Sequence, residues 1–163
     1  MSDDLIQGLE KFDSWMEQVI ETLSPARRRS LFRDIARDLR SRNQKRITAQ
    51  QDPDGSSWEP RKTVRPAAGK SRTGQIRKKK KMMLGLRSAR RLKFTASPDS
   101  ADIGFAGRTA RIAMVHHFGG MDLVDQDGTT KVRYPVRQLL GFSPDDRDAV
   151  RDRILSTISQ AFK

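Results

Sequence analysis

The sequence predicts an α+β fold in which an N-terminal helical hairpin and a C-terminal helix pack on a small antiparallel sheet, with a long basic loop. Near both ends of the 163-residue chain, apolar residues recur at spacings of three and four, the period of an amphipathic helix. Between residues 92 and 134, short stretches alternate apolar and polar residues, the period of a strand. We expect a single domain made of a helical hairpin at 3–48, a basic extended loop at 50–91 and an α+β body at 92–163.

The N-terminal hairpin is predicted from two apolar stripes. The first helix, over residues 3–23, has its stripe at Leu5, Leu9, Phe12, Met16, Val19, Ile20 and Leu23. Ser24 suits an N-cap and Pro25 the first position of a second helix, whose stripe continues toward Ile47. The link is so short that the two helices should be near-antiparallel neighbours. The stripes are expected to form an intramolecular core; the alternative is that part of them faces a neighbouring subunit.

An irregular loop is predicted after this hairpin. Asp52-Pro53-Asp54-Gly55 is a strong turn signal. From Trp58 to about Lys81 the chain has Pro, Gly, Ser and positive charge, with too few apolar residues to offset the entropy of ordering them. We therefore expect a mobile loop in the free protein, with Trp58 anchoring the turn to the folded body or to a subunit neighbour. The alternative is a solvated linker without a partner.

Positive charge is concentrated in and just after this loop. Residues 61–93 contain fourteen of the 33 basic residues and no Asp or Glu, so the remainder nearly balances the 20 acidic residues. A neutral domain with a local basic cassette suits contact with one anionic surface, either phosphate backbone or an acidic protein ring. No aromatic residue lies within 61–93, which argues against base stacking and leaves phosphate contact as the limit of nucleic-acid binding. The residues expected to bind the partner are Arg61, Lys62, Arg65, Lys70, Arg72, Arg77, Lys78, Lys79, Lys80 and Lys81.

The next stretch is predicted to form a hairpin followed by a short helix. Residues 92–96 and 101–105 alternate apolar and polar side chains around a turn at 97–100. A helix over residues 108–118 should end at Gly119-Gly120. Its inward residues are expected to be Ile112, Ala113 and Val115.

The C-terminal stretch repeats this order. Strands at 121–124 and 129–134 should form a second hairpin, turned by Asp127-Gly128. Ser143-Pro144 and the two aspartates that follow cap the last helix, because acidic residues are favourable at its positive end. The apolar positions of this helix are Val150, Ile154, Leu155, Ile158 and Phe162.

Several classes of function are disfavoured. The chain has no Cys, no window near the roughly 20 apolar residues of a membrane helix, and an acidic start unlike a secretory signal. His116 and His117 are adjacent on a helix and cannot both face one metal, so we expect a structural or interface role for them. Most carboxylates lie in turns or at helix starts, which disfavours a Mg²⁺ nuclease. We expect a cytosolic protein without enzyme activity, metal or cofactor.

Four stretches together resemble a known family. They are residues 24–29 (SPARRR), 44–47 leading into 52–58 (QKRI, DPDGSSW), 109–113 running into 115–119 (TARIA, VHHFG) and 134–144 (YPVRQLLGFSP). Their joint order resembles the phage virion morphogenesis family, in particular the tail completion proteins of contractile-tailed temperate phages. The likeness extends from about Ser24 to Asp146. His117 stands where a Gln is expected in this family.

The resemblance implies a structural protein that acts late in virion assembly. Family membership implies a homo-oligomeric ring, typically sixfold, at the head-proximal end of the tail, where it meets tail tube, sheath or neck proteins and supports head–tail joining. It implies a place in the virion, with host cytoplasm as the site of assembly, and no membrane. The basic loop would dock on an acidic tail or neck partner or line a DNA-conducting channel. The alternative is a small nucleic-acid-binding protein that uses residues 61–93 on phosphate.

Overall fold

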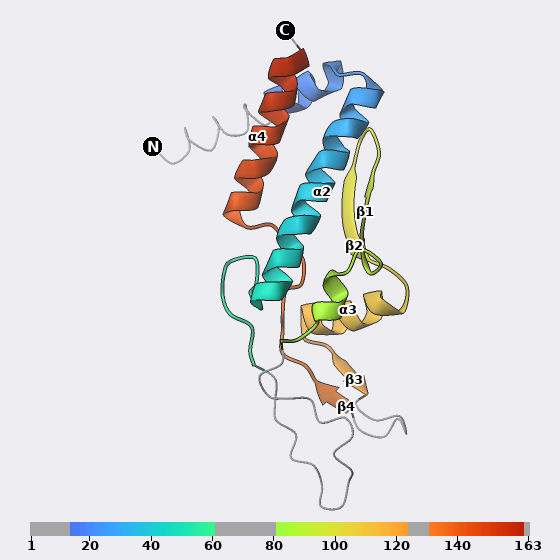
Figure 1. Ribbon diagram of the computed structural model, residues 1–163, viewed down its shortest axis with the longest axis vertical. Helices are drawn as coiled ribbons and strands as arrows, with labels where there is room; N and C mark the ends of the chain where they lie inside the picture. Colours follow the sequence, from blue (N-terminus) through green and yellow to red (C-terminus); the bar gives the residue numbers. More distant parts are fainter. Residues whose placement is uncertain (1–13, 61–80, 124–130, 162–163) are drawn as a thin grey trace, which may run out of the picture. The chain divides into compact units, whose positions relative to one another are not determined.

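The computed structural model describes residues 14–60, 81–123 and 131–161. Its elements follow the predicted order and confirm an α+β fold (Figure 1). Residues 14–22 are helical and precede α2 (Pro25–Ala49), the 3₁₀ turn η1 (Leu84–Arg87), β1 (Leu92–Ala96) and β2 (Ala101–Phe105). The remaining elements are α3 (Arg108–Phe118), β3 (Met121–Leu123), β4 (Lys131–Arg133) and α4 (Pro144–Ala161). In the described ranges, no helix is long and apolar enough to cross a membrane.

Contacts within the chain gather into two compact units. Unit 1 comprises Met1–Ser41, Phe94–Ile103 and Phe142–Lys163, and unit 2 comprises Arg42–Lys93 and Gly104–Gly141. Both units are assembled from segments far apart in the sequence, so neither could be read as a continuous stretch of the chain.

The core of unit 1 is formed by helices with one hairpin residue. Leu23, Leu31, Ile35 and Leu39 are buried together, and the partly buried residues packed against them are Phe32, Ile103, Val150, Ile154 and Ala161. Helix α4 runs beside the first part of α2 (Figure 1). The predicted stripe of α2 therefore serves an intramolecular core at these positions, as expected from its spacing of three and four.

The helix starts in unit 1 have the caps that the sequence predicts. The Oγ of Ser24 accepts a hydrogen bond from the backbone N of Arg27 at 3.4 Å. At α4, the Oγ of Ser143 accepts from the backbone N of Asp146 at 3.1 Å, and Oδ2 of Asp146 accepts from the backbone N of Ser143 at 3.0 Å. This reciprocal pair is a capping box, with Asp in the place of the usual Glu.

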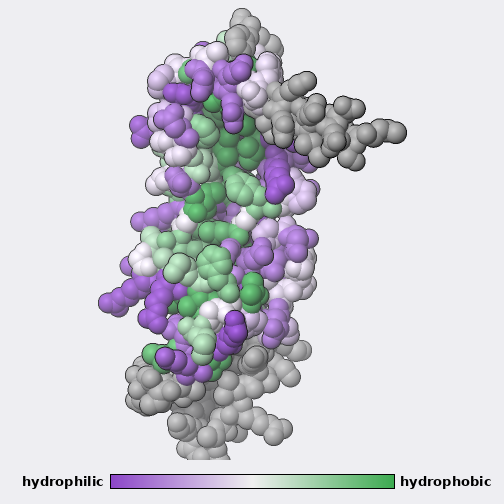
Figure 2. All heavy atoms as spheres, turned by 180° about the vertical axis from the view of Figure 1, so that it is seen from behind, coloured by the Kyte–Doolittle hydropathy of each residue, from purple (hydrophilic) through white to green (hydrophobic). Residues whose placement is uncertain are grey.

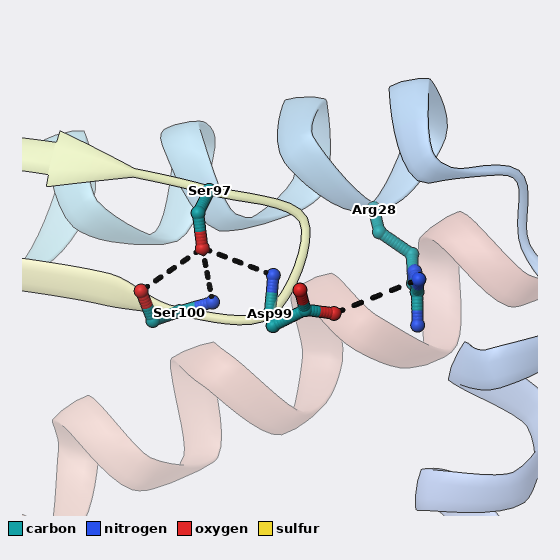
Figure 3. A network of polar contacts seen from close by, with 4 residues as sticks. All are labelled: Arg28, Ser97, Asp99 and Ser100. Carbon is teal, nitrogen blue, oxygen red and sulfur yellow. Dashed lines mark hydrogen bonds and ion pairs between the residues drawn. The ribbon is translucent and has the colours of Figure 1, made fainter.

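The turn of the β1–β2 hairpin is held by the side chain of Ser97 (Figure 3). Its Oγ accepts hydrogen bonds from the backbone N of Asp99 at 3.1 Å and of Ser100 at 2.9 Å, and lies 3.0 Å from Oγ of Ser100. Arg28 of α2 forms an ion pair with Asp99 at 3.5 Å. The turn predicted at 97–100 is confirmed, and an arginine from the first turn of α2 contacts it.

The core of unit 2 joins residues from all parts of that unit. Ile47, Trp58, Met82, Leu86, Ala113 and Leu139 are buried together. Helix α3 ends at Gly119, whose φ of 69° lies in the left-handed region that glycine tolerates. The strands β3 and β4 are antiparallel, with Met121 opposite Arg133 and Leu123 opposite Lys131. The turn predicted at Asp127-Gly128 lies outside the described residues.

Three details differ from the prediction. The strands form two separate two-stranded sheets, β1–β2 and β3–β4, because alternation fixes which face a strand buries but not which strand it pairs with. The expected loop at 50–91 is folded at both ends, where buried Trp58, Met82 and Leu86 supply apolar contacts. Ile112 is 48% exposed rather than inward, because Ala113 takes the buried side of the helix.

Candidate partner-binding site at the base of the basic segment

The basic segment, residues 61–81, begins and ends on a folded base in unit 2. Helix α2 ends at Ala49, and Gln50 turns the chain with a φ of 64°. The carbonyl of Gln50 accepts a hydrogen bond from the backbone N of Trp58 at 2.8 Å, and Gln51 pairs with Ser57 in an isolated antiparallel bridge. Residues 50–58 therefore form a closed turn rather than an open loop.

Trp58 and Asp52 secure this turn. Trp58 is 6% exposed, and its Nε1 donates to Oδ1 of Asp52 at 2.7 Å. The same oxygen accepts from the backbone N of Gln138 at 2.6 Å. Because one carboxylate oxygen receives both donors, Asp52 ties the turn to the segment that follows β4.

The first end of the basic segment is fixed by a buried arginine. Arg137 is 3% exposed, and its Nε and Nη2 both donate to the carbonyl of Glu59, at 3.1 and 2.8 Å. The backbone N of Arg137 donates to the carbonyl of His116 at 2.8 Å, which connects it to α3. The chain is therefore held two residues before Arg61, the first residue of the segment.

The other end is fixed by the side chain of Gln50. Its Nε2 donates to the carbonyl of Met82 at 2.9 Å, and its Oε1 accepts from the backbone N of Met82 at 2.6 Å. Lys81 is exposed, and its Nζ donates to the carbonyl of Thr48 at 2.8 Å. Gln50 thus bonds through its backbone to Trp58 and through its side chain to Met82, so one residue joins both ends.

A close backbone approach supports the same base. A Cβ built on Gly141 would lie 2.5 Å from Cγ of Pro53, so only glycine fits without a shift. The carbonyl of Gly141 accepts from Nη2 of Arg46 at 2.7 Å, and its N donates to Oδ1 of Asn43 at 3.2 Å. The turn at residues 52–55 and the LLGFSP stretch, far apart in sequence, are therefore in contact.

The two histidines have structural contacts. Nδ1 of His117 accepts a hydrogen bond from the backbone N of Leu139 at 3.2 Å, and the His116 ring meets Tyr134 edge to face at 4.6 Å. Burial lowers the pKa of His117, and the negative charge of Asp52 partly opposes this shift. Across the described part of the chain, no three His, Cys, Asp or Glu residues are placed to hold a metal.

Most of the predicted partner-binding residues cannot be placed. Trp58 and Lys81 belong to the base, and the residues outside the described ranges are Arg61, Lys62, Arg65, Lys70, Arg72, Arg77, Lys78, Lys79 and Lys80. The residues that the sequence did not single out are Gln50, Asp52 as a two-donor acceptor, and Arg137. Asp52 carried only a turn signal, and neither Gln50 nor Arg137 belongs to any pattern that indicates a tie between distant segments.

A second basic surface lies on α2. Arg29, Arg33 and Arg37 are exposed and four residues apart, so successive side chains are neighbours along the helix surface. Summing charge over everything outside residues 61–93 hid this surface, because acidic residues elsewhere balance it.

Comparison with known proteins agrees with this architecture. The chain belongs to the phage virion morphogenesis family, which it matches over residues 8–159. The match extends past both ends of the stretches that carried the resemblance. The chain is 36% identical over 152 residues to tail completion protein S of Escherichia phage P2, which covers 93% of this chain and 97% of that protein. No solved structure matches the chain significantly.

Proposed function

We propose that this chain completes the phage tail as a structural, non-catalytic virion protein. It assembles as a ring, typically sixfold, at the head-proximal end of the tail, and supports joining of the tail to the head. The folded units build the ring during assembly in the host cytoplasm, and the basic segment docks on an acidic partner among the tail tube, sheath or neck proteins. The similarity to a tail completion protein supports this role.

The observation that carries the proposal is the closed base of the basic segment. Gln50, Asp52 and Arg137 fix the chain on both sides of residues 61–80. A linker between independent parts needs no such closure. A segment anchored at both ends on a rigid base instead presents its charges from a defined position, which lowers the entropy lost when a partner orders it.

The charge of the segment predicts how docking responds to salt. Ten Lys or Arg residues lie within 61–81, with no acidic residue among them. Contact with an acidic protein surface should therefore be faster and tighter at low ionic strength and weaken as salt screens the charges.

The test is complementation of a lysate whose phage lacks this protein. We expect DNA-filled heads and unjoined or abnormally long tails without it, and joined virions after addition of purified protein, as seen by electron microscopy. A variant with Lys78, Lys79, Lys80 and Lys81 replaced by Ser should restore joining only at low salt. The matched control removes four charges from α2 by changing Arg29, Arg33, Arg37 and Lys45 to Gln, and should restore joining at all salt concentrations.

A second candidate function is contact with DNA, favoured by the exposed arginines of α2. Phosphate binding would use both basic surfaces and fall steeply with salt. In that case the α2 variant and the Lys78–Lys81 variant would both lose affinity for duplex DNA of arbitrary sequence. Docking on protein alone predicts no duplex binding at physiological salt by the unmodified chain.

A further inference from the structure

Large apolar side chains are exposed together on one part of unit 2. They are Ile112 at 48%, Met114 at 59%, Phe118 at 72%, Met121 at 61%, Leu123 at 41% and Val136 at 54%. The space-filling view in Figure 2 shows apolar (green) side chains at the surface of the molecule among hydrophilic (purple) ones. Soluble proteins rarely leave so many large apolar residues of one region in water unless a partner covers them.

These residues are neighbours by helix spacing, strand register and contact. Met114 and Phe118 are four apart on α3, on the side away from buried Ala113. Gly119, which follows Phe118, packs closely against Val136, since a Cβ there would lie 2.8 Å from Cγ2 of Val136. Met121 and Leu123 point to the same side of β3. We call this surface the α3–β3 face.

The α3–β3 face also carries positive charge. Arg133 is opposite Met121 and Lys131 is opposite Leu123, and paired residues of an antiparallel ribbon project to the same side. All four are exposed, while Asp122 on the other side of β3 forms an ion pair with Arg111. The exposed side of the ribbon therefore alternates apolar residues with cations.

This mixture fits a protein rather than nucleic acid. Phosphate contact would use Lys131 and Arg133 but would leave Phe118, Met121 and Leu123 in water, so it would not account for the apolar half of the face. A partner helix with apolar and acidic residues would cover both kinds of side chain.

The chain itself contains such a helix. Residues 1–22 hold six of its 20 acidic residues and one basic residue, in a protein of net charge +13. In the described part, residues 14–22 are helical, with Glu17 and Glu21 exposed and one turn apart. Trp15 on the same helix is 46% exposed, and half-exposed Trp is a frequent anchor of protein interfaces.

We propose that the α3–β3 face of one copy binds the helix at residues 14–22 of a second copy, with Trp15 against the apolar side chains and Glu17 and Glu21 near Lys131 and Arg133. The two surfaces are different, so the contact is head to tail and closes a ring when the rotation between copies allows it. This inference rests on the ring in the proposed function and names the surfaces that build it.

Two charge-reversed variants test the contact. The face variant carries Lys131→Glu with Arg133→Glu, and the helix variant carries Glu17→Lys with Glu21→Lys. Each should weaken self-association by about a hundredfold, measured as the dissociation constant by sedimentation, because like charges then meet across the interface. Mixed one to one, the variants should form heterodimers and nothing larger, since each retains one unmodified surface. A chain with all four changes should associate again.

The control and the contradicting outcomes are distinct. Arg33→Glu with Lys45→Glu reverses the same amount of charge on exposed α2 positions and should leave association unchanged, and circular dichroism should show all variants folded. Heterodimers in the mixture support the contact. Unchanged association of either variant overturns it, as does a mixture that stays monomeric or an unmodified chain that never associates. Joined virions assembled with a non-associating variant would overturn the ring while leaving the tail role intact.

Discussion

Replacing Trp58 with Ala should destabilise the fold strongly. Trp58 is 6% exposed, packs with Ile47 and Leu139 in the core of unit 2, and donates from Nε1 to Asp52 at 2.7 Å. Removing a buried Trp typically costs about 3–5 kcal/mol through lost burial and the cavity left behind. Because the free energy of unfolding of a domain is about 5–15 kcal/mol, this one change should remove a large share of it.

Urea unfolding followed by circular dichroism measures the effect without relying on tryptophan fluorescence. Trp58→Phe is the matched control, since it keeps most of the apolar volume and loses the hydrogen bond, and should cost about 1–2 kcal/mol. A change within about 0.5 kcal/mol for Trp58→Ala would show that Trp58 is not part of a packed core, and the base described for the basic segment would be wrong.

Three further predictions follow from individual contacts. Burial lowers the pKa of His117 below its ordinary value of 6.5, so stability present above that pH should fall as pH drops toward the folded-state pKa; His117→Gln, which can still accept from Leu139, should flatten this part of the stability–pH curve, and an unchanged curve would contradict the assignment. Gly141→Ala should cost about 1–3 kcal/mol by thermal unfolding because its Cβ would meet the rigid Pro53 ring, whereas Gly104→Ala, with open space around it, should not do so. Trypsin should cut within residues 61–81 of the free subunit and cut the same bonds far more slowly in virions, and equal cleavage in both would leave the segment without a partner.

Local structure was predictable where short-range chemistry decides it. The caps at Ser24 and Ser143, the turn at 97–100 and the glycine that ends α3 all depend on side chains within a few residues of one another. These positions were found from the sequence because propensity and hydrogen bonding act there without help from distant parts of the chain.

Long-range ties were not predictable. Gln50 bonds to Met82 across 32 positions, Asp52 to Gln138 across 86 and Arg137 to Glu59 across 78. No local pattern distinguishes these residues from exposed polar ones, so the sequence placed the ends of the basic segment in a loop. The exposed apolar residues of the α3–β3 face were missed for a related reason, because helical period identifies an apolar position but not whether the chain or a partner covers it.

The central claim is that this protein acts at the end of the tail that meets the head. The most direct measurement is electron microscopy of virions in which this protein carries a gold-binding label. The account predicts label at the junction between head and tail, arranged around the tail axis. Label on the baseplate, along the sheath or only on material outside the virion would contradict it.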